Sequence, residues 1–418
     1  MNKKIIVAHP MKQHSFHTAI ALKREGILYN YITTTYVSKK SITSRLLKFL
    51  NGNTLKKAES RRCLEIDENV IQFCEFENLI YLGMQRIACL KTFRRWYIRK
   101  VIDRFGKKVA KYAIKNNVDA VIMYDTTATS CFKYLSKKAP NIKRILDVSI
   151  CTGEFMKMNF EQDMEKTGTL GHKLESDFLW NKSVMDDRNE EIRLSQYFLG
   201  ASKVVKESLI YCGVNEDDIY LVPYGVDKTK FSFIPKVKEK LPLKLVFVGQ
   251  ITYRKGIHHL LKIISSMNQY EVELYLAGSI DKSSDIILGY DKYPNIHFKG
   301  FVTRDILPKL YQESDVFIFP SFAEGYALVI LEALSCGLPC IVSNLSGGND
   351  AIQDGYNGFT FEAGNDEELL SKIQWFIENY DKISEMSYNA RNSINDLSWD
   401  EYYKNINKAL KSILERDK

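Results

Sequence analysis

Along the first half of the chain, short apolar runs alternate with segments whose apolar residues recur at helical spacing. The apolar runs have strand length and are bounded by polar loops. Ser202 is a residue type that caps helix starts, and Gly213 follows the same segment as a helix stop. The expected strands are residues 4–8, 27–34, 120–124, 144–147 and 196–201, and the expected helices are residues 18–25 and 203–211. Strands that alternate with helices are typical of a parallel, Rossmann-like sheet.

The second half repeats this alternation around one stretch, residues 315–348. An apolar run is followed there by a tight turn at Glu324 and Gly325, and the next segment of helix length stops at Gly337. The expected strands of this half are residues 243–249, 271–278, 296–300, 315–319 and 340–343. One expected helix begins at residue 257, and two others cover residues 329–334 and 399–414. A strand, a turn, a helix and a further strand build a ligand crevice at the strand ends of a parallel sheet.

The length of 418 residues exceeds what one hydrophobic core usually supports and suits two domains of about 200 residues each. We expect a first α/β domain over residues 1–227, a second over residues 228–396 and a terminal helix over residues 397–418. The apolar start of the chain is interrupted at His9 and Pro10, so it reads as a first strand rather than a signal peptide. The eight cysteines form no C-x-x-C pair and are expected to be free thiols of a cytoplasmic protein.

Charge is distributed unevenly between the two halves. Residues 1–227 carry 37 Lys and Arg against 26 Asp and Glu, whereas the remainder carries 22 against 25. Two basic amphipathic stretches, residues 39–57 and 91–115, contribute much of the excess. Such helices bind anionic membrane surfaces, and they also occur as solvated helices of a basic domain, so both interpretations stay open. No nucleic-acid-binding motif accompanies the charge, and nucleic acid is not an expected partner.

Two acids bracket the central turn and the helix after it. Glu324 lies where a strand ends, and Glu332 follows eight residues later, about two helical turns on, so it returns to nearly the same face. The backbone N–H groups at the helix start suit phosphate oxygens. The residues of this start are Gly325, Tyr326, Ala327 and Leu328. A carboxylate at Glu332 can accept both hydroxyls of a ribose, so the pattern predicts a nucleotide site. An ordinary α/β unit with a surface Glu at each end is the alternative.

A second turn carries cations beside another helix start. It follows the strand over residues 243–249, runs from Gln250 to Gly256 and includes Arg254 and Lys255. Cations at a helix start add charge-assisted hydrogen bonds to the helix dipole and can clamp a diphosphate. A solvent-facing Arg-Lys turn is the alternative.

The segments over residues 319–326 and 331–339 resemble the E-x7-E signature of retaining, family 4 type, GT-B glycosyltransferases. The resemblance implies two facing Rossmann-like domains, with the final helix crossing back onto the first. It implies that Glu324 lies against the donor sugar, that Glu332 holds the nucleotide ribose, and that small residues at the turn admit the diphosphate. The V-P-Y-G-V-D run over residues 222–227 resembles the joint between the two domains of the family. The resemblance covers residues 200–415 well and the first half only by pattern.

The resemblance also extends to the cation turn and to a histidine. The usual G-R-x-x-x-x-K-G of the family places an Arg and a Lys on the diphosphate; here Lys255 matches the Lys, Gln250 stands at the Arg position, and Arg254 is the expected substitute. Many members carry a histidine of the first domain that touches the donor sugar, and His14 is the candidate for a catalytic role. The chain has no D-x-D motif, so no metal is expected at the diphosphate and no cofactor is required.

These observations predict a cytoplasmic, metal-independent, retaining glycosyltransferase that uses a nucleotide-diphosphate sugar. The expected acceptor is a glycan or a polyprenyl-diphosphate-linked sugar of bacterial surface polysaccharide assembly, with the protein peripheral on the inner face of the membrane. A sugar-nucleotide epimerase of the same fold and a non-catalytic sugar-nucleotide-binding subunit are the alternatives. A nicotinamide dehydrogenase is disfavoured, because no G-x-G-x-x-G follows the first strand.

Overall fold

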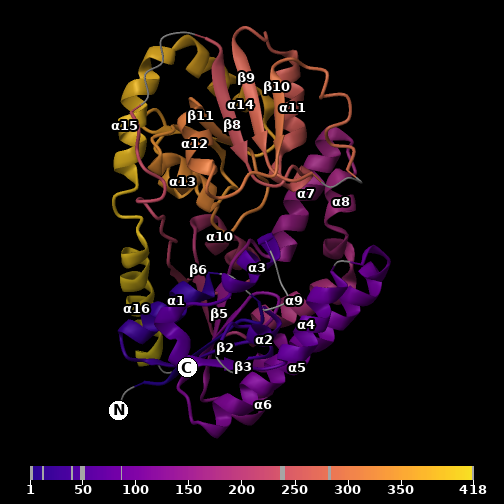
Figure 1. Ribbon diagram of the computed structural model, residues 1–418, viewed down its shortest axis with the longest axis vertical. Coiled ribbons are helices and arrows are strands. Elements are labelled where there is room, and N and C mark those ends of the chain that lie inside the picture. The colour runs from indigo at the N-terminus through magenta and orange to yellow at the C-terminus, as the bar shows by residue number, and fades with distance from the viewer. Residues whose placement is uncertain are drawn as a thin grey trace.

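Two α/β halves are stacked along the long axis of the molecule (Figure 1). The computed structural model describes residues 3–11, 14–38, 41–47, 52–85, 87–235, 241–280 and 284–416. Each half is built on one parallel sheet, as the alternation of strand and helix patterns predicts. Part of the basic stretch over residues 39–57, including Lys39 and Lys48, lies outside the described residues.

The first sheet has seven strands in the order β3-β2-β1-β4-β5-β6-β7. Their bounds are β1 Ile5–Ala8, β2 Leu28–Thr33, β3 Val70–Gln72, β4 Ala120–Tyr124, β5 Lys143–Val148, β6 Tyr197–Gly200 and β7 Ile219–Leu221. In β1 and β4 every residue is buried, which is typical of strands covered by helices on both faces. The edge strand β3 was not expected, because the sequence of residues 38–115 indicates a basic helical insertion without a strand. It has only three residues, all half-buried, so its apolar pattern is too short to detect.

The helices of the first half cover both faces of this sheet and extend to its side (Figure 1). They are α1 Ser15–Arg24, α2 Ile42–Leu47, α3 Gly52–Glu59, α4 Glu75–Met84, α5 Lys91–Lys115, α6 Thr129–Lys138, α7 Gly153–Thr167, α8 Gly171–Glu175, α9 Lys182–Leu194 and α10 Lys203–Tyr211, with 3-10 turns η1 Leu64–Asn69, η2 Ala88–Leu90, η3 Asp177–Trp180 and η4 Glu216–Asp218. Ser202 caps α10, as predicted, because its Oγ accepts a hydrogen bond from the N–H of Val205 at 3.3 Å.

The second sheet has six strands in the order β10-β9-β8-β11-β12-β13. They are β8 Leu243–Val248, β9 Val272–Ala277, β10 Ile296–Gly300, β11 Val316–Phe319, β12 Cys340–Ser343 and β13 Gly358–Phe361. The helices are α11 Ile257–Ser266, α12 Leu307–Gln312, α13 Leu328–Ser335, α14 Asp366–Glu378, α15 Ile383–Ser393 and α16 Trp399–Glu415, with 3-10 turns η5 Tyr253–Lys255, η6 Asn349–Ala351 and η7 Tyr380–Lys382. All pairings within this sheet are parallel.

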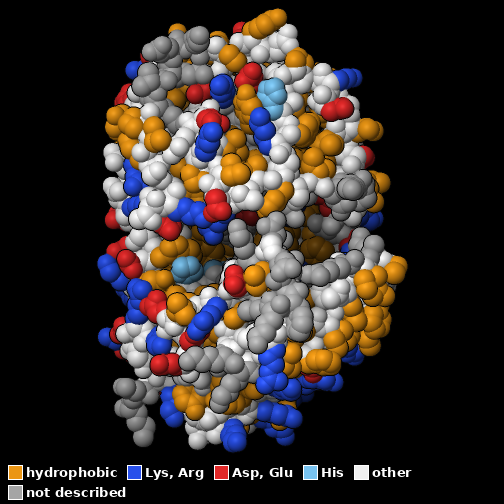
Figure 2. Space-filling model, viewed as in Figure 1, with side chains coloured by type: hydrophobic (Ala, Val, Ile, Leu, Met, Phe, Trp, Pro, Cys, Tyr) orange, Lys and Arg blue, Asp and Glu red, His pale blue; other side chains and the backbone are white. Residues whose placement is uncertain are grey.

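Strand order places a crevice between the two halves. In each sheet the order reverses direction between two central neighbours, β1 and β4 in the first and β8 and β11 in the second. Loops that leave such neighbours diverge to opposite sides, which opens a crevice at the carboxyl ends of the strands. The face seen in Figure 2 is hollowed between the upper and lower halves. The predicted site residues follow these strands, so topology alone brings them to this crevice.

The last helix returns to the first half, as the fold prediction requires. Helix α16 lies beside α1 (Figure 1), and the hydroxyls of Thr18 and Tyr402 are 2.9 Å apart. The rings of His17 and Trp399 stack with centroids 3.5 Å apart. At the joint, a Cβ on Gly225 would lie 2.2 Å from the backbone nitrogen of Trp399, so only glycine lets the two segments approach this closely.

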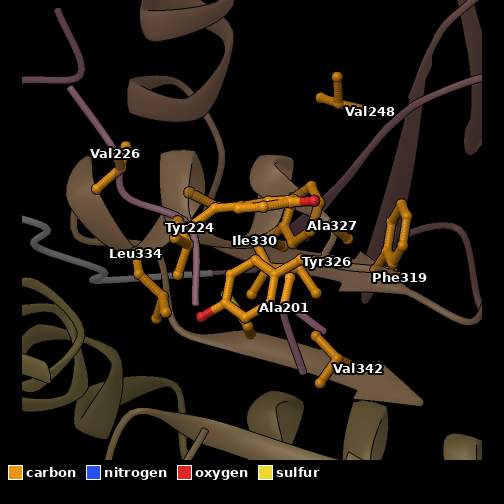
Figure 3. Close-up of a cluster of buried hydrophobic side chains, with 14 of the residues drawn as sticks. Ala201, Tyr224, Val226, Val248, Phe319, Tyr326, Ala327, Ile330, Leu334 and Val342 are labelled. Carbon is orange, nitrogen blue, oxygen red and sulfur yellow. The ribbon is translucent and has the colours of Figure 1, made fainter. Parts of the chain in front are cut away.

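A buried apolar cluster links the joint to the helix of the central stretch. Figure 3 shows Tyr224 and Val226 of the joint in one cluster with Tyr326 and Ile330. Burial of this surface stabilises the stacking of the halves by removing apolar area from water. Among the described residues, no helix combines the length and apolar character needed to cross a bilayer.

Candidate functional site

Glu324 lies just beyond β11, with its carboxylate buried in the crevice. Arg254 Nη1 donates to Glu324 Oε1 at 2.7 Å, Ser321 Oγ donates to the same oxygen at 2.9 Å, and Lys255 Nζ also donates to it. Burial works to raise the pKa of Glu324, but the charges of Lys255 and Arg254 outweigh it and lower that pKa. The carboxylate is therefore ionised and held by two cations.

Lys255 is itself buried, and its environment is unusual for an ammonium group. Its Nζ lies 4.8 Å from the centre of the Phe319 ring. Burial lowers the pKa of Lys255 to about 8, although Glu324 opposes the shift. A buried ammonium is costly unless it is paired, and Glu324 supplies that partner.

The turn after Glu324 is held by side chains of the first half. Cys151 Sγ donates to the carbonyl of Glu324 at 2.9 Å, and Ser202 Oγ donates to the carbonyl of Gly325 at 2.6 Å. A Cβ on Gly325 would lie 1.9 Å from the carbonyl oxygen of Ser149, so glycine is required where the halves meet. No side chain caps the start of α13 among the described residues, so its first N–H groups are candidates to bind a ligand.

Glu332 lies on α13 and is buried. Arg304 Nη2 donates to its Oε1 at 3.1 Å, and the Tyr311 hydroxyl lies 3.5 Å from its Oε2. Burial raises the pKa of Glu332, and Arg304 opposes the shift. The structure therefore separates the two acids of the motif: Glu324 is gripped by the cation turn, and Glu332 is held by a different arginine.

His14 comes from the loop before α1 and reaches the crevice from the first half. Its Nε2 lies 3.2 Å from Asp147 Oδ1, and the Tyr224 hydroxyl is 3.0 Å from the same nitrogen. Asp147 is in β5, which was expected as a strand over residues 144–147. The ring of Tyr224 lies 5.8 Å from that of Tyr326, which connects this histidine to the central turn.

The structure brings Arg254, Lys255 and Glu324 together, and it leaves Gln250 outside this group. Gln250 is exposed, and in the described part of the chain no hydrogen bond joins it to Glu324. Arg254, rather than Gln250, joins Lys255 at Glu324, and its contact with a diphosphate stays a prediction.

Sequence reasoning did not single out several side chains of this site. They are Cys151, Tyr224, Arg304 and Tyr311. Arg304 lies 28 residues from Glu332, and Cys151 lies 173 residues from Glu324. No local pattern reports contacts of that separation, so the only available signal was the position of Cys151 just after an expected strand.

Metal-binding residue types cluster at one place in the described part of the chain. Asp163, His258 and His259 offer donor atoms that all lie within 4.8 Å of one another. Each imidazole contacts the Asp163 carboxylate directly, and the other nitrogen of His259 contacts Asp366. Hydrogen bonding therefore accounts for the arrangement.

Comparison with known families assigns a class to the second half. Residues 227–393 match the family described as "Glycosyl transferases group 1". The matched region contains the cation turn, the central turn and Glu332. The match to this region supports a glycosyltransferase enzyme.

The relatives found by sequence are also glycosyltransferases. The capsular polysaccharide biosynthesis glycosyltransferase CapM of Staphylococcus aureus is 30% identical over 40% of this chain and 46% of its own length. The UDP-Gal:alpha-D-GlcNAc-diphosphoundecaprenol alpha-1,3-galactosyltransferase of Escherichia coli is 32% identical over 42% of this chain and 49% of its own. An uncharacterized glycosyltransferase of Methanocaldococcus jannaschii is 26% identical over 51% and 59%. The chain thus spans about half the length of these relatives.

Solved structures extend the similarity to the whole fold. HepE of Anabaena, determined in complex with UDP, has a TM-score of 0.61 at 15% identity and covers 98% of this chain and 100% of its own. Sucrose-phosphate synthase of Thermosynechococcus elongatus has a TM-score of 0.64 at 14% identity over 98% and 99%. These matches confirm the predicted GT-B fold of two facing Rossmann-like domains.

The first prediction concerns the grip on the nucleotide. Lys255→Ala and Glu332→Ala should each weaken binding of a nucleoside diphosphate, because each removes a charge-assisted contact worth roughly 1.5–3 kcal/mol. Calorimetric titration measures the loss. Lys309→Ala, at an exposed lysine paired with Glu313, is the matched control and should bind as the wild type does. Unchanged affinity in both site variants would show that Lys255 and Glu332 do not form a nucleotide site.

The second prediction is a pH dependence. Burial lowers the pKa of Lys255 to about 8, so the ammonium loses its proton as the pH rises through that value. An anionic ligand binds the protonated form better, so affinity for a nucleoside diphosphate should be constant below pH 8 and fall by about tenfold per pH unit above it. Titrations between pH 7 and 9 measure this slope. Lys255→Arg should give a flat profile, because a guanidinium stays protonated throughout. A flat wild-type profile would contradict the assignment.

Proposed function

We propose that the protein is a retaining glycosyltransferase that moves a sugar from a nucleotide-diphosphate sugar to a glycan or polyprenyl-diphosphate-linked acceptor. The observation that carries the proposal is the buried group of Glu324, Arg254 and Lys255 beside the start of α13. Two cations and a set of ligand-accessible N–H groups converge where both sheets end. A diphosphate is the ligand class that this arrangement suits.

The donor is proposed to lie across the second half of the crevice. Its diphosphate takes hydrogen bonds from Arg254, Lys255 and the amides of Gly325 to Leu328, and its ribose hydroxyls bind the Glu332 carboxylate. Two cations face one carboxylate, so a net positive charge is left for the diphosphate. In this proposal that charge takes the place of a metal at the diphosphate. No cofactor takes part.

The state of Glu324 favours retention of configuration. A catalytic base must be free to take a proton, whereas the Glu324 carboxylate accepts three hydrogen bonds and its pKa is lowered. We assign it instead to the donor sugar, where a fixed negative charge stabilises the positive charge that develops at the ring. The bond from the anomeric carbon to the diphosphate breaks, and the electron pair leaves with the nucleotide. The acceptor hydroxyl attacks from the face of the departing diphosphate, which takes the hydroxyl proton.

His14 is the second proposed catalytic residue. Its Nε2 is held by Asp147 and by the Tyr224 hydroxyl, so the ring is fixed at the edge of the crevice. With Nε2 engaged in this way, the proposed hydrogen bond toward the sugar is made by the other ring nitrogen, Nδ1. The two halves thereby contribute one residue each to the reacting end of the site.

The proposed acceptor class rests on the relatives and on charge. The name of one relative identifies a diphosphoundecaprenol-linked substrate, and the name of another places it in capsular polysaccharide biosynthesis. The excess of basic residues in the first half suits an acceptor that carries a diphosphate. A uridine nucleotide is the first donor to test, since HepE was determined with UDP.

The third prediction tests the function directly. Glu324→Gln keeps the size of the side chain but removes the charge at the reacting end, so turnover should fall by about 10²-fold or more while affinity for the nucleoside diphosphate changes little. A melting-temperature panel of UDP-, GDP-, ADP- and dTDP-sugars first identifies the donor, because a ligand of the folded state raises Tm. Transfer, or slow donor hydrolysis, is then measured for both proteins.

Matched measurements decide the outcome. Glu313→Gln, at an exposed glutamate of the same half, should leave turnover unchanged. Full turnover in Glu324→Gln would show that Glu324 is not a catalytic residue. Tight nucleotide binding by the wild type without transfer or hydrolysis would favour a non-catalytic subunit, and conversion of the donor to its epimer without an acceptor would favour an epimerase.

We further propose that the first half binds an anionic membrane surface. Five exposed apolar side chains lie on α4, on α5 and between them, where Figure 2 shows apolar side chains gathered along one side of the lower half. They are Phe76, Ile80, Ile87, Phe93 and Trp96. Basic residues of α5 flank them, and those at 95, 99 and 100 are exposed. Apolar side chains that insert and cations that bind headgroups are the combination used by peripheral proteins.

The fourth prediction concerns this surface. Wild-type protein should sediment with vesicles that contain anionic lipid at low salt and be released at about 0.5 M salt, because screening shortens the range of the charges. Replacing Arg94, Arg95, Arg99 and Lys100 with Gln should reduce sedimentation and leave activity on a soluble acceptor intact. Replacing Lys372 and Lys382 of the second half with Gln is the control and should change neither. Equal sedimentation of all proteins would show that α5 is a solvated helix and does not bind the membrane.

A further inference from the structure

Two helices of the first half reach across to the second half and pack against the cation turn. Helices α7 and α8 extend upward beside α11 in Figure 1. A Cβ on Gly171 of α8 would lie 2.3 Å from the ring of Tyr253 in η5, so the glycine backbone rests directly on that ring. The Tyr253 hydroxyl donates to Asp285 Oδ1 at 3.0 Å, which fixes the ring from the other side.

One carboxylate of α8 binds the backbone of the cation turn. Glu175 Oε2 accepts hydrogen bonds from the N–H groups of Tyr253 at 2.8 Å and Arg254 at 3.3 Å. These are N–H groups at the start of a 3-10 turn, where a negative charge is favourable. The carboxylate thereby fixes the backbone from which the Arg254 side chain projects.

A second carboxylate, Asp163 of α7, binds the start of α11. His258 Nε2 lies 2.9 Å from its Oδ2, and His259 Nε2 lies 2.8 Å from its Oδ1. His172 of α8 completes the group, with its Nε2 2.8 Å from Oδ2. The Asp163 and His172 side chains are fully buried, and the rings of Phe160 and Phe322 lie 4.4 Å and 5.1 Å from that of His172. A low dielectric strengthens hydrogen bonds in such a place.

The charges of this group balance through hydrogen bonds alone. Both ring nitrogens of His259 face carboxylates, Asp163 at 2.8 Å and Asp366 at 2.5 Å, which requires an imidazolium. Burial works to lower the pKa of His259, but the two carboxylates outweigh it and raise that pKa to about 9. Lys262 Nζ pairs with Asp366 at 2.7 Å. Two anions and two cations therefore form a neutral network that spans both halves.

From these contacts we infer that Asp163 and Glu175 are positioning residues for the donor diphosphate. Glu175 holds the backbone of the cation turn, and Asp163 holds the side chains of His258 and His259 at the start of α11, just after the turn. The orientation of Arg254 and Lys255 therefore depends on the first half. The inference rests on the proposed function, since it assigns the donor diphosphate to these cations. When the halves separate, the turn loses Glu175 and α11 loses Asp163, so strong diphosphate binding is confined to the closed arrangement.

The test compares ligands that do and do not reach the cations. With full-length protein, Asp163→Asn and Glu175→Gln should each weaken binding of the nucleoside diphosphate by about tenfold and leave binding of the nucleoside alone unchanged. Glu165→Gln, at an exposed position of α7, is the matched control and should alter neither affinity. In a Lys255→Ala background the two variants should cost much less, because the cation that they position is gone.

Each outcome has one meaning. If the wild type binds no nucleoside diphosphate, the proposed function fails before this inference is reached. If the wild type binds and both folded variants keep its preference for diphosphate over nucleoside, the inference is overturned. Asp163 is buried, so Asn at this position can unfold the chain; the half-exposed Glu175 then carries the test. One equivalent of transition metal in the purified protein would also overturn the hydrogen-bonded network.

Discussion

The buried charge of Glu324 is the constraint on which the site depends. A carboxylate in this position would be unfavourable alone, and it is tolerated because Arg254, Lys255 and Ser321 donate to it. The cations come from the turn after β8 and the acid from the turn after β11, and these strands are neighbours in the sheet. The order of the strands therefore creates the ion group before any ligand arrives. Two cations matched to one carboxylate leave positive charge for an anionic ligand.

The second constraint is that the site is complete only where the halves meet. Side chains of the first half bind the carbonyls of Glu324 and Gly325, and its Glu175 carboxylate binds the backbone of the cation turn. Glycine at position 325 permits this contact, because any side chain would collide with Ser149. The return of α16 onto α1 and the apolar cluster of Figure 3 support the same spacing. The geometry of the turns at Glu324 and Arg254 therefore depends on contacts from both halves.

The two halves differ in what they are similar to and in the surface they expose. The family match covers residues 227–393, which lie in the second half. The first half carries the excess positive charge and the exposed apolar side chains of α4 and α5. Solved structures of the same fold retain its overall arrangement at 14–15% identity. Parallel strands buried on both faces tolerate such divergence, because the sheet requires apolar volume at each position rather than particular residues.

Local patterns in the sequence determined the secondary structure of most of the sheet, the turn at Glu324 and Gly325, the cap at Ser202 and the positions of Lys255 and Glu332. Apolar periodicity, helix stops and short motifs act over a few residues, and the expected elements begin and end within three residues of their bounds in the structure. The edge strands β3, β7 and β13 were not predicted, because runs of three or four residues carry too little pattern. Tertiary structure alone decided that Arg254 joins Glu324, that Arg304 pairs with Glu332, and that Asp163 meets His258 and His259. These partners are between 28 and 96 residues apart, and only the packed sheets and the closure of the two halves bring them within hydrogen-bond distance.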